Sequence, residues 1–471
     1  MIFLNKSSKE PLYIQIYSQI KKEILDGVLK ECQILAGSRS LAKTLKVSRN
    51  TVDNAYSQLL AEGYISPQKG IGHIVMKVPE IKVSERQKPL IVNRTQSNNN
   101  INRHKVLFDL TNSSYTSDLF PKNLWKRYTL ECLEVLERNA KISSYQDKQG
   151  ELYLRRNLLS YLERIRGVCC DESQIIITCG IQQSLDYICK LISSERSTIL
   201  MEEPGFDKAV SVFTNNGMEI QTAPVDENGI IVTRLPVTHN ICAVYSTPSH
   251  QFPTGATLPI DRRYELLKWV EQNDVYIIED DFDSEQRYYS KPIPSLQSID
   301  INNRVIYLGT FSKGLSPSIR MGYMILPPQL MEIYFGKFEN YNSTVPLLNQ
   351  YVISRLIETG QYDRHIRRLN NVFRKRLELF LSEFSDVKEK IKITSNGSGQ
   401  YFLLEFSEKV KQTELIEKAL EQGVRVYSTM QFWQEKAACP PNTLFLGFSK
   451  INFEDIPDCI ARLKRAWAEW L

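Results

Sequence analysis

The chain has 471 residues, of which 42% are hydrophobic and 24% are charged. This length exceeds what one core usually holds, and the apolar content excludes a disordered protein, so we expect two or three folded domains. No stretch approaches the roughly 20 successive apolar residues of a membrane helix, and the first residues lack the pattern of a signal peptide. We therefore expect a cytoplasmic protein without membrane contact.

The nine cysteines are odd in number and show no CxxC spacing. Cys179 and Cys189 lie in apolar surroundings, which favours buried free thiols over disulfides or metal ligands. We expect no metal site.

The positive charge is concentrated at the front of the chain. Residues 1–79 hold 11 Lys or Arg against 6 Asp or Glu, and residues 80–106 hold 6 against 2. Because the whole chain carries +5, the rest carries −4. A basic front on a mildly acidic body is typical of a phosphate-binding module joined to a domain that does not bind nucleic acid, although a solvated basic surface would look the same.

The basic front has the pattern of a winged helix-turn-helix. Apolar residues recur at helical spacing from Leu12, and Gly27 marks the end of this first helix. SRSLAKTLK predicts a short second helix, and VSRNTVDNAYSQLLAEGY predicts a third helix with Ser48 as its N-cap. YISPQKGIGHIVMKV then reads as a two-stranded wing.

The start of the third helix is the part of such a motif that enters the major groove. Arg49, Asn50 and Thr51 stand there, and an arginine can bond bidentately to guanine. The alternative for Arg49 alone is a solvated cap residue, but the whole arrangement favours contact with double-stranded DNA. Arg39 is better placed for a phosphate. The other candidates lie in the cap and the wing: Ser48, Lys69, Gly70, Gly72 and His73.

The stretch SRSLAKTLKVSRNTVDNAYSQLLAEGY resembles the winged-helix domain of the GntR family of bacterial regulators. We assign residues 1–79 to this DNA-binding domain and residues 80–106, which are polar and lack a helical or strand period, to a flexible linker.

Residues 107–471 predict an α/β domain. Apolar strand-like runs alternate with amphipathic helices, which predicts a mostly parallel sheet covered by helices. From about Gln361, helices and strands such as QYFLLEF and TLFLGFS indicate a smaller α+β subdomain.

Ligands of open α/β sheets bind beyond the carboxyl ends of the strands. Gly180 follows one strand and opens a helix, whose free N–H groups suit a phosphate. Asp280 follows a second strand, where a buried carboxylate needs a cationic partner such as a protonated pyridine nitrogen. Lys313 follows a third strand and can form an imine with an aldehyde. Each residue alone has a structural explanation, but their joint occurrence predicts a site for pyridoxal phosphate (PLP).

Further residues around these strand ends complete the candidate site. Hydroxyl and guanidinium groups near Lys313 can hold a dianionic phosphate. The candidates for this role are Thr310, Ser312 and Arg320, together with Ile181 and Gln182 beside Gly180.

Six segments occur in an order that resembles the fold type I aminotransferases over residues 107–471. They are SYQDKQG, TCGIQQ, MEEPGF, TPSHQFPTG, IIEDDFDSE and GTFSKGLSPSIRMGY. Joined to a GntR-like domain, this order is similar to the MocR subfamily of regulators. The resemblance implies Lys313 as the Schiff-base lysine, Asp280 as partner of the pyridine nitrogen and Phe206 as the ring-stacking residue. It also implies a homodimer with shared sites, in which Tyr145 reaches the phosphate in the partner subunit.

The sequence departs from the aminotransferase pattern at three positions. Phe282 and Phe252 stand where those enzymes have a tyrosine and an asparagine near the phenolic oxygen of the cofactor. Lys450 takes the apparent place of the arginine that clamps a substrate carboxylate, and a lysine cannot make the same planar bidentate contact. Lys450 and Lys208, which follows the EEPG segment, could still hold a carboxylate or a phosphate, so these two lysines are the candidate effector-binding residues.

These features predict a PLP-dependent transcription regulator that senses an amino compound, or PLP itself, and has at most residual transamination activity. One alternative is a working aminotransferase that its DNA-binding module only localises. The other is a DNA-binding protein whose large domain is a dimerisation scaffold without cofactor.

Overall fold

The computed structural model describes residues 2–79, 105–112, 115–193, 196–237, 239–407 and 410–471. The chain divides into two compact units, residues 1–99 and 100–471, each of which is described by itself. Most of the predicted linker, residues 80–104, lies outside the described residues.

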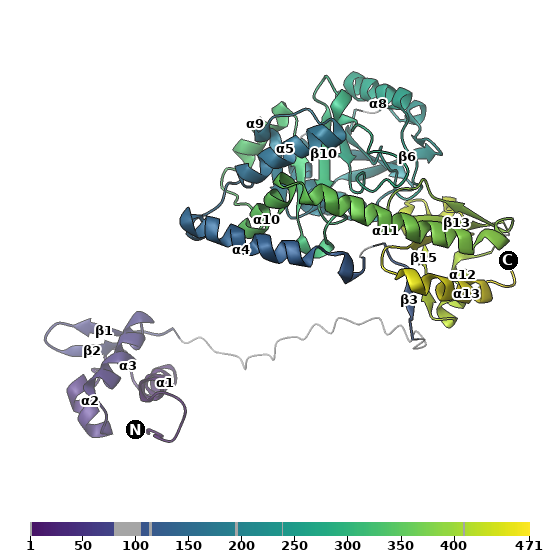
Figure 1. The fold of residues 1–471 in the computed structure, drawn as a ribbon. Helices are drawn as coiled ribbons and strands as arrows, with labels where there is room; N and C mark the ends of the chain where they lie inside the picture. Colours follow the sequence, from purple (N-terminus) through teal and green to yellow (C-terminus); the bar gives the residue numbers. More distant parts are fainter. Residues whose placement is uncertain (1, 80–104, 113–114, 194–195, 238, 408–409) are drawn as a thin grey trace. The chain divides into compact units, whose positions relative to one another are not determined.

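The first unit is a winged helix-turn-helix (Figure 1). Its elements are α1 (Leu12–Leu25), α2 (Ser38–Leu45), α3 (Arg49–Ala61), β1 (Ile65–Gln68) and β2 (Gly72–Val75). Ile16 from α1 and Val52 and Leu59 from α3 are fully buried in its core. As predicted, the side chain of Ser48 caps α3, accepting from the backbone N–H of Thr51 at 3.2 Å. The wing strands pair antiparallel, with Ile65 opposite Val75.

The second unit is built around an eight-stranded sheet of order β4-β11-β10-β9-β8-β5-β6-β7. Strands β10, β9, β8, β5 and β6 run parallel, whereas β11 and β7 run antiparallel to their neighbours. The bounds are β4 (Ile175–Thr178), β5 (Thr198–Glu203), β6 (Glu219–Asp226), β7 (Gly229–Ile230), β8 (Ile241–Ser246), β9 (Tyr276–Asp280), β10 (Val305–Thr310) and β11 (Gly322–Ile325). The predicted α/β class is confirmed, with the reversed strands β11 and β7 as additions.

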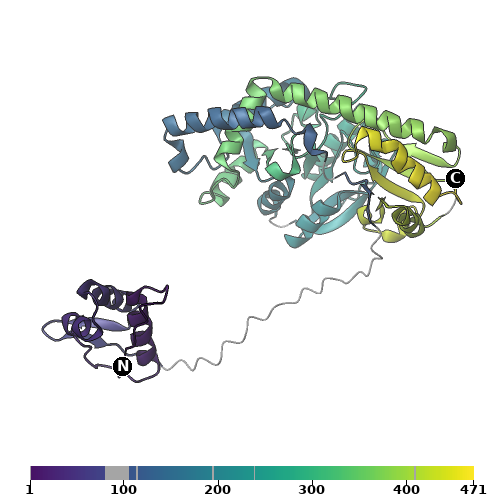
Figure 2. The same ribbon diagram turned by 60° about the horizontal axis from the view of Figure 1, so that its bottom comes forward.

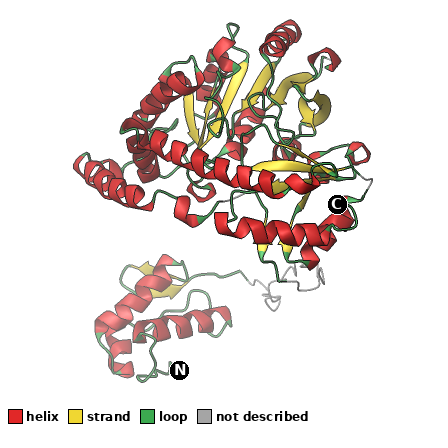
Figure 3. Ribbon diagram, turned by 45° about the vertical axis from the view of Figure 1, so that its right-hand side comes forward, coloured by secondary structure: helices red, strands yellow, loops and turns green. Residues whose placement is uncertain are grey.

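Helices cover both faces of this sheet (Figure 3). Successive strand residues point to opposite faces, so that Ile176 packs in one core and its neighbours Ile175 and Ile177 pack in another. The helices are α4 (Lys122–Arg138), α5 (Leu152–Arg166), α6 (Ile181–Ile192), α7 (Asp207–Asn215), α8 (Ile260–Asn273), α9 (Pro328–Lys337) and α10 (Leu347–Glu358). None of the described helices is both long and apolar enough to cross a bilayer.

The C-terminal part forms the smaller α+β subdomain that the sequence predicts. The long helix α11 (Gln361–Glu383) reaches from the large sheet to this subdomain (Figure 1, Figure 2). Its antiparallel sheet has the order β12-β13-β16-β15. The bounds are β12 (Ile391–Thr394), β13 (Tyr401–Phe406), β15 (Tyr427–Ser428), β16 (Thr443–Gly447), α12 (Gln412–Glu421) and α13 (Ile456–Ala466).

The segment that follows the predicted linker joins this subdomain. Strand β3 (Phe108–Asp109) pairs in parallel with β14 (Val424–Arg425). The backbone N–H of Gly447 then donates to the carbonyl oxygen of Leu110 at 2.8 Å. The start of the large domain is therefore held by its C-terminal end.

All nine cysteines are free thiols, and five of them are buried. Cys189 is buried as predicted, whereas Cys179 is only half-buried because it lies in the turn between β4 and α6.

A buried ion pair fixes the chain just beyond β9. The Nε and Nη2 atoms of Arg166, at the end of α5, lie 2.7 and 3.0 Å from the two carboxylate oxygens of Asp281. Both side chains are 1% exposed. Ser284 and Tyr307 also donate hydroxyl hydrogen bonds to Asp281. Since Asp281 follows β9 directly, this pair holds the end of that strand in place.

Replacing Arg166 by methionine should lower the free energy of unfolding by about 3–5 kcal/mol, because it leaves the Asp281 carboxylate buried without its cation. Urea unfolding of the full chain measures the change. The matched control is Arg156→Met, which breaks the largely exposed pair of Arg156 with Glu172 and should cost about 1 kcal/mol or less. Equal losses in the two variants would contradict the importance of the buried pair.

Candidate functional site

A cavity of about 210 Å³ opens at the carboxyl ends of β8, β9 and β10. It gathers side chains that are far apart in the sequence, from the segment after β3 to the turn before β11. The lining residues are Asn112, Ile181, Gln182, Phe206, Lys208, Tyr245, Thr247, Phe252, Asp280, Phe282, Thr310, Ser312, Lys313, Pro317 and Arg320. The structure thus brings together most of the cofactor-site residues that the sequence predicts.

Lys313 follows the end of β10, and its Nζ donates to the carbonyl oxygen of Asn112 at 2.8 Å. Removal from water disfavours the charged amine and lowers the pKa of Lys313 to about 8. The negative charge of Asp283 opposes this shift, and the positive charge of Lys208 adds to it. A larger fraction of Lys313 is therefore neutral, and nucleophilic, at neutral pH than for an ordinary lysine.

Asp280 is the last residue of β9 and is 3% exposed. Its Oδ2 accepts a hydrogen bond from the hydroxyl of Tyr245, whereas its Oδ1 is buried without a partner among the described residues. Burial raises the pKa of Asp280 to about 7, against the lowering effect of the Tyr245 hydrogen bond. A buried carboxylate oxygen without a partner is costly, so this atom fits a donor that a ligand would supply, such as a protonated ring nitrogen.

The opposite end of the cavity suits an anion. Helix α6 begins after Gly180, whose φ of +84° is in the region that favours glycine. The Nη2 atom of Arg320 donates to the carbonyl oxygen of Cys179 at 3.1 Å, and a Cβ on Gly180 would lie 3.1 Å from that same nitrogen. Thr310 and Ser312, whose hydroxyl groups lie 3.0 Å apart, line the same end. A guanidinium group, hydroxyl groups and a helix N-terminus form a suitable cradle for a phosphate.

Phe206, Phe252 and Phe282 form an aromatic side of the cavity. The ring of Phe252 lies edge-on to Phe206 and Phe282, with centroid distances of 5.7 and 6.0 Å. Phe282 stacks at 6.1 Å on the imidazole of His250, whose Nδ1 lies 2.8 Å from Oδ2 of Asp283.

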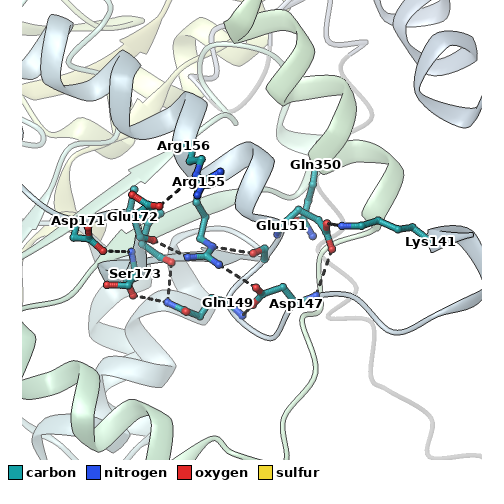
Figure 4. A network of polar contacts seen from close by, with 12 residues as sticks. Lys141, Asp147, Gln149, Glu151, Arg155, Arg156, Asp171, Glu172, Ser173 and Gln350 are labelled. Carbon is teal, nitrogen blue, oxygen red and sulfur yellow. Dashed lines mark hydrogen bonds and ion pairs between the residues drawn. The ribbon is translucent and has the colours of Figure 1, made fainter. Parts of the chain in front are cut away.

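Tyr145 does not line the cavity of its own chain and is 89% exposed. A network of polar contacts holds the loop that presents it (Figure 4). The buried Arg155 donates to the carbonyl oxygen of Gly150 at 2.9 Å and to Oδ2 of Asp147 at 3.0 Å, and Lys141 pairs with Glu151. The hydroxyl of Tyr145 is therefore carried outward on an ordered loop.

The two candidate effector-binding lysines are placed differently. Lys208, at the start of α7, lines the cavity. Lys450 is not among its lining residues, and its Nζ lies 3.5 Å from Oδ2 of Asp109.

The predicted DNA-binding residues lie on α2, α3 and the wing. Arg49 is exposed at the start of α3 and pairs with Asp53 at 3.3 Å. The ring of His73 packs edge-on against Tyr56 at a centroid distance of 5.2 Å. The exposed members of the set are Arg39, Ser48, Arg49, Asn50, Lys69, Gly70 and Gly72, whereas Thr51 and His73 are half-buried.

Sequence reasoning missed several residues of the cavity. Tyr245 was overlooked because it lies inside the apolar run of β8, and only the pairing of β8 with β9 places it beside Asp280. Asn112 contributes a backbone carbonyl, for which the sequence has no signal. Thr247 follows β8 in the TPSHQFPTG loop, so the strand-end rule was the signal that could have found it.

No group of three or more His, Cys, Asp or Glu side chains is placed to hold a metal ion in the parts of the chain that the structure describes.

The fold and the cavity define a DNA-binding unit joined to a domain of the aminotransferase type. The family model of class I and II aminotransferases matches residues 107–435, and that of the gntR family of bacterial regulatory proteins matches residues 12–75. The uncharacterised HTH-type transcriptional regulator YhdI of Bacillus subtilis is 35% identical over 99% of this chain and 98% of its own. The probable rhizopine catabolism regulatory protein MocR of Rhizobium meliloti is 29% identical over 99% of this chain and 96% of its own.

Solved structures agree with this assignment. A kynurenine aminotransferase of Pyrococcus horikoshii, in complex with PMP, has a TM-score of 0.70 and 26% identity, covering 78% of this chain and 92% of its own. LysN, an α-aminoadipate aminotransferase of Thermus thermophilus complexed with N-(5'-phosphopyridoxyl)-L-leucine, has a TM-score of 0.66 and 25% identity, covering 78% and 93%. The chain belongs to the MocR-type transcriptional regulators of the GntR family, which carry an aminotransferase class I and II domain.

Replacing Gly180 by alanine should weaken binding of PLP about tenfold or more. The added Cβ presses on Arg320, and the backbone conformation of Gly180, with φ +84° and ψ 175°, costs about 1–3 kcal/mol in a residue other than glycine. Titration of the apoprotein with PLP measures the affinity. Gly217→Ala is the matched control, because Gly217 also has a positive φ but has nothing within 4 Å of an added Cβ. A similar loss of affinity in both variants would argue against the cradle.

Proposed function

We propose that this protein is a PLP-dependent transcription regulator whose large domain senses an amino compound, or PLP itself, and alters how the winged helix engages DNA. The observation that carries the proposal is the buried, unpartnered Oδ1 of Asp280, whose side chain lines the same cavity as Lys313, an amine whose pKa is lowered to about 8 by burial. The cofactor supplies an aldehyde that condenses reversibly with amines.

Each part of the cavity has a role toward such a group. Arg320, Ser312 and Thr310, with the start of α6, would hold its phosphate, Asp280 its ring nitrogen and Lys313 its aldehyde carbon. Phe206 would stack on the ring. The solved relatives that contain PMP or a phosphopyridoxyl group support this assignment.

The hydrogen bond from Lys313 to Asn112 offers a route for the signal. Asn112 ends the segment that begins at the predicted linker, and this segment is paired with β14 and β16 of the small subdomain. If Lys313 held the aldehyde carbon of PLP, its Nζ would have fewer protons to donate to the carbonyl oxygen of Asn112, and an effector amine that took its place would restore them. Effector binding can therefore change the hold on the segment that leads to the DNA-binding unit, provided that the effector binds one arrangement better than the other.

We also propose a homodimer in which Tyr145 completes the phosphate site of the partner subunit. This role is supported by the exposure of Tyr145 and by the contacts that order its loop. Two paired winged helices would then contact two half-sites of an operator.

Sensing is favoured over sustained transamination because of Phe252 and Phe282. Both side chains line the cavity and neither can donate a hydrogen bond to the phenolic oxygen of the cofactor. Turnover of an amino acid with an oxo-acid acceptor at enzymatic rates would contradict this part of the proposal.

Replacing Lys313 by alanine should abolish the visible absorbance band of the cofactor, because no amine remains to bond its aldehyde. Absorbance spectra of the purified proteins measure this. DNA binding without effector should persist, but its response to amines should be lost. A colourless native protein would contradict the proposal.

The rate at which Lys313 bonds PLP should rise with pH through a midpoint near pH 8, because only the deprotonated amine is nucleophilic. Lys208→Met should move this midpoint upward, since the charge of Lys208 lowers the pKa of Lys313. Initial rates of the absorbance change across a pH series measure the midpoint. Lys450→Met is the control and should leave it unchanged, because Lys450 pairs with Asp109.

Replacing Arg49 by alanine should weaken operator binding by about 1–3 kcal/mol and relax the preference at one base pair, if Arg49 bonds guanine. Lys69→Ala, in the exposed wing tip, should weaken binding about equally for all sequences and reduce its salt dependence. Titrations against a set of operator variants at two salt concentrations measure both. A uniform loss for Arg49→Ala would instead assign this residue to a phosphate.

A further inference from the structure

The aromatic side of the cavity continues into the small subdomain. Phe252, which lines the cavity, packs against three rings from β13, β16 and the loop between β15 and β16. We call this group the aromatic wall; its members are Phe206, Phe252, Phe282, Tyr401, Phe432 and Phe445.

The aromatic wall is densely packed and largely buried. The ring of Phe252 lies 4.8 Å from Phe432 and 5.5 Å from Tyr401, measured between centroids, and Tyr401 stacks on Phe445 at 4.7 Å. Phe252, Tyr401, Phe432 and Phe445 are between 3% and 7% exposed. Apart from the hydroxyl of Tyr401, which is buried without a partner among the described residues, this surface offers a charged group nothing that replaces its hydration.

The small subdomain brings no cation to the cavity within the described residues. All lining residues precede Met321. The buried guanidinium of Arg376 donates to the carbonyl oxygen of Ser449 and to the hydroxyl of Thr116 at 3.1 Å, and Lys450 pairs with Asp109. Arg376 and Lys450 are thus engaged elsewhere.

Three cationic side chains line the cavity, and none of them offers a ligand carboxylate a buried partner that is free of another role. Arg320 lies at the anion cradle and Lys313 is the reactive amine. Lys208 is exposed at the start of α7, so it offers a ligand an exposed rather than a buried partner, although its charge still lowers the pKa of Lys313. Among the described residues of one chain, the cavity therefore offers apolar contact and an amine-reactive centre, but no buried clamp for a second anion.

We propose, building on the function proposed above, that the effector is an amine with an apolar, preferentially aromatic, group and no carboxylate. Its amino group lies toward Lys313 and its apolar group packs on Phe252 and Phe282. Burial of apolar surface and edge-to-face ring contacts stabilise this arrangement, whereas the carboxylate of an amino acid is excluded by its cost of desolvation.

The test compares 2-phenylethylamine with phenylalanine, which differs from it by a carboxylate on the carbon that bears the amine. Each compound is titrated into the full-length protein loaded with PLP, and both the cofactor absorbance and the affinity for operator DNA are recorded. We expect 2-phenylethylamine to act at a concentration at least about tenfold lower than phenylalanine. Equal potency, or a preference for phenylalanine, would overturn the inference.

Two variants test whether the aromatic wall is responsible for the selectivity between amines. Phe252→Leu keeps an apolar side chain but removes the ring, and it should weaken 2-phenylethylamine about tenfold relative to butylamine while the visible band shows that the cofactor is still bound. Phe453→Leu, at an exposed position, is the control and should change neither value. Unchanged selectivity in Phe252→Leu would overturn the role of the aromatic wall.

The failure of this inference is distinguishable from failure of the proposed function. If the protein binds PLP and responds only to amino acids, or only to free PLP, the inference is wrong and the proposed regulator remains. If no visible band forms with PLP, both are wrong.

Discussion

Three successive carboxylates at the end of β9 are buried, and the arrangement of the large domain follows from how each of them is satisfied. Glu279 accepts backbone N–H groups of Leu296 and Gln297 at 2.8 and 2.9 Å. Asp281 is paired with Arg166 from α5. Of the three, only Asp280 keeps a buried oxygen without a partner among the described residues, and its side chain lines the cavity that contains Lys313. Unpaired buried charge is costly, so this oxygen suits a donor that the proposed cofactor would supply.

Lys313 connects the cavity with both ends of the domain. Its Nζ donates to the carbonyl of Asn112, near the start, while its own carbonyl accepts from Gln286 at 2.9 Å and from Gln400 of the small subdomain at 3.4 Å. Lys313 therefore contacts groups that the sequence separates by most of the domain. This is the geometry that a sensor needs, because a ligand can shift an equilibrium only through contacts that differ between two states.

The side chains that favour the proposed sensor over an enzyme are apolar. Phe252 and Phe282 stand where hydrogen-bonding groups would tune the cofactor, and the aromatic wall closes the side of the cavity toward the small subdomain. The aminotransferase fold is thus retained together with its lysine and its carboxylate. What is altered is the environment in which a ligand is recognised.

The sequence by itself determined the two units, the winged helix with its Ser48 cap, the main strands of the large sheet and the strand-end residues Asp280 and Lys313, because these depend on local periodicity, capping and the position of polar residues after apolar runs. Tertiary structure alone decided that Tyr245 donates to Asp280, that Asn112 holds Lys313 and that Arg166 pairs with Asp281, since these contacts join residues 35 to 201 positions apart. It also decided that Lys450 lies at Asp109, outside the cavity lining, whereas Phe445 packs in the aromatic wall. Spacing along the chain carries no information on such pairings, which are set by strand order and by the packing of the small subdomain on the large one.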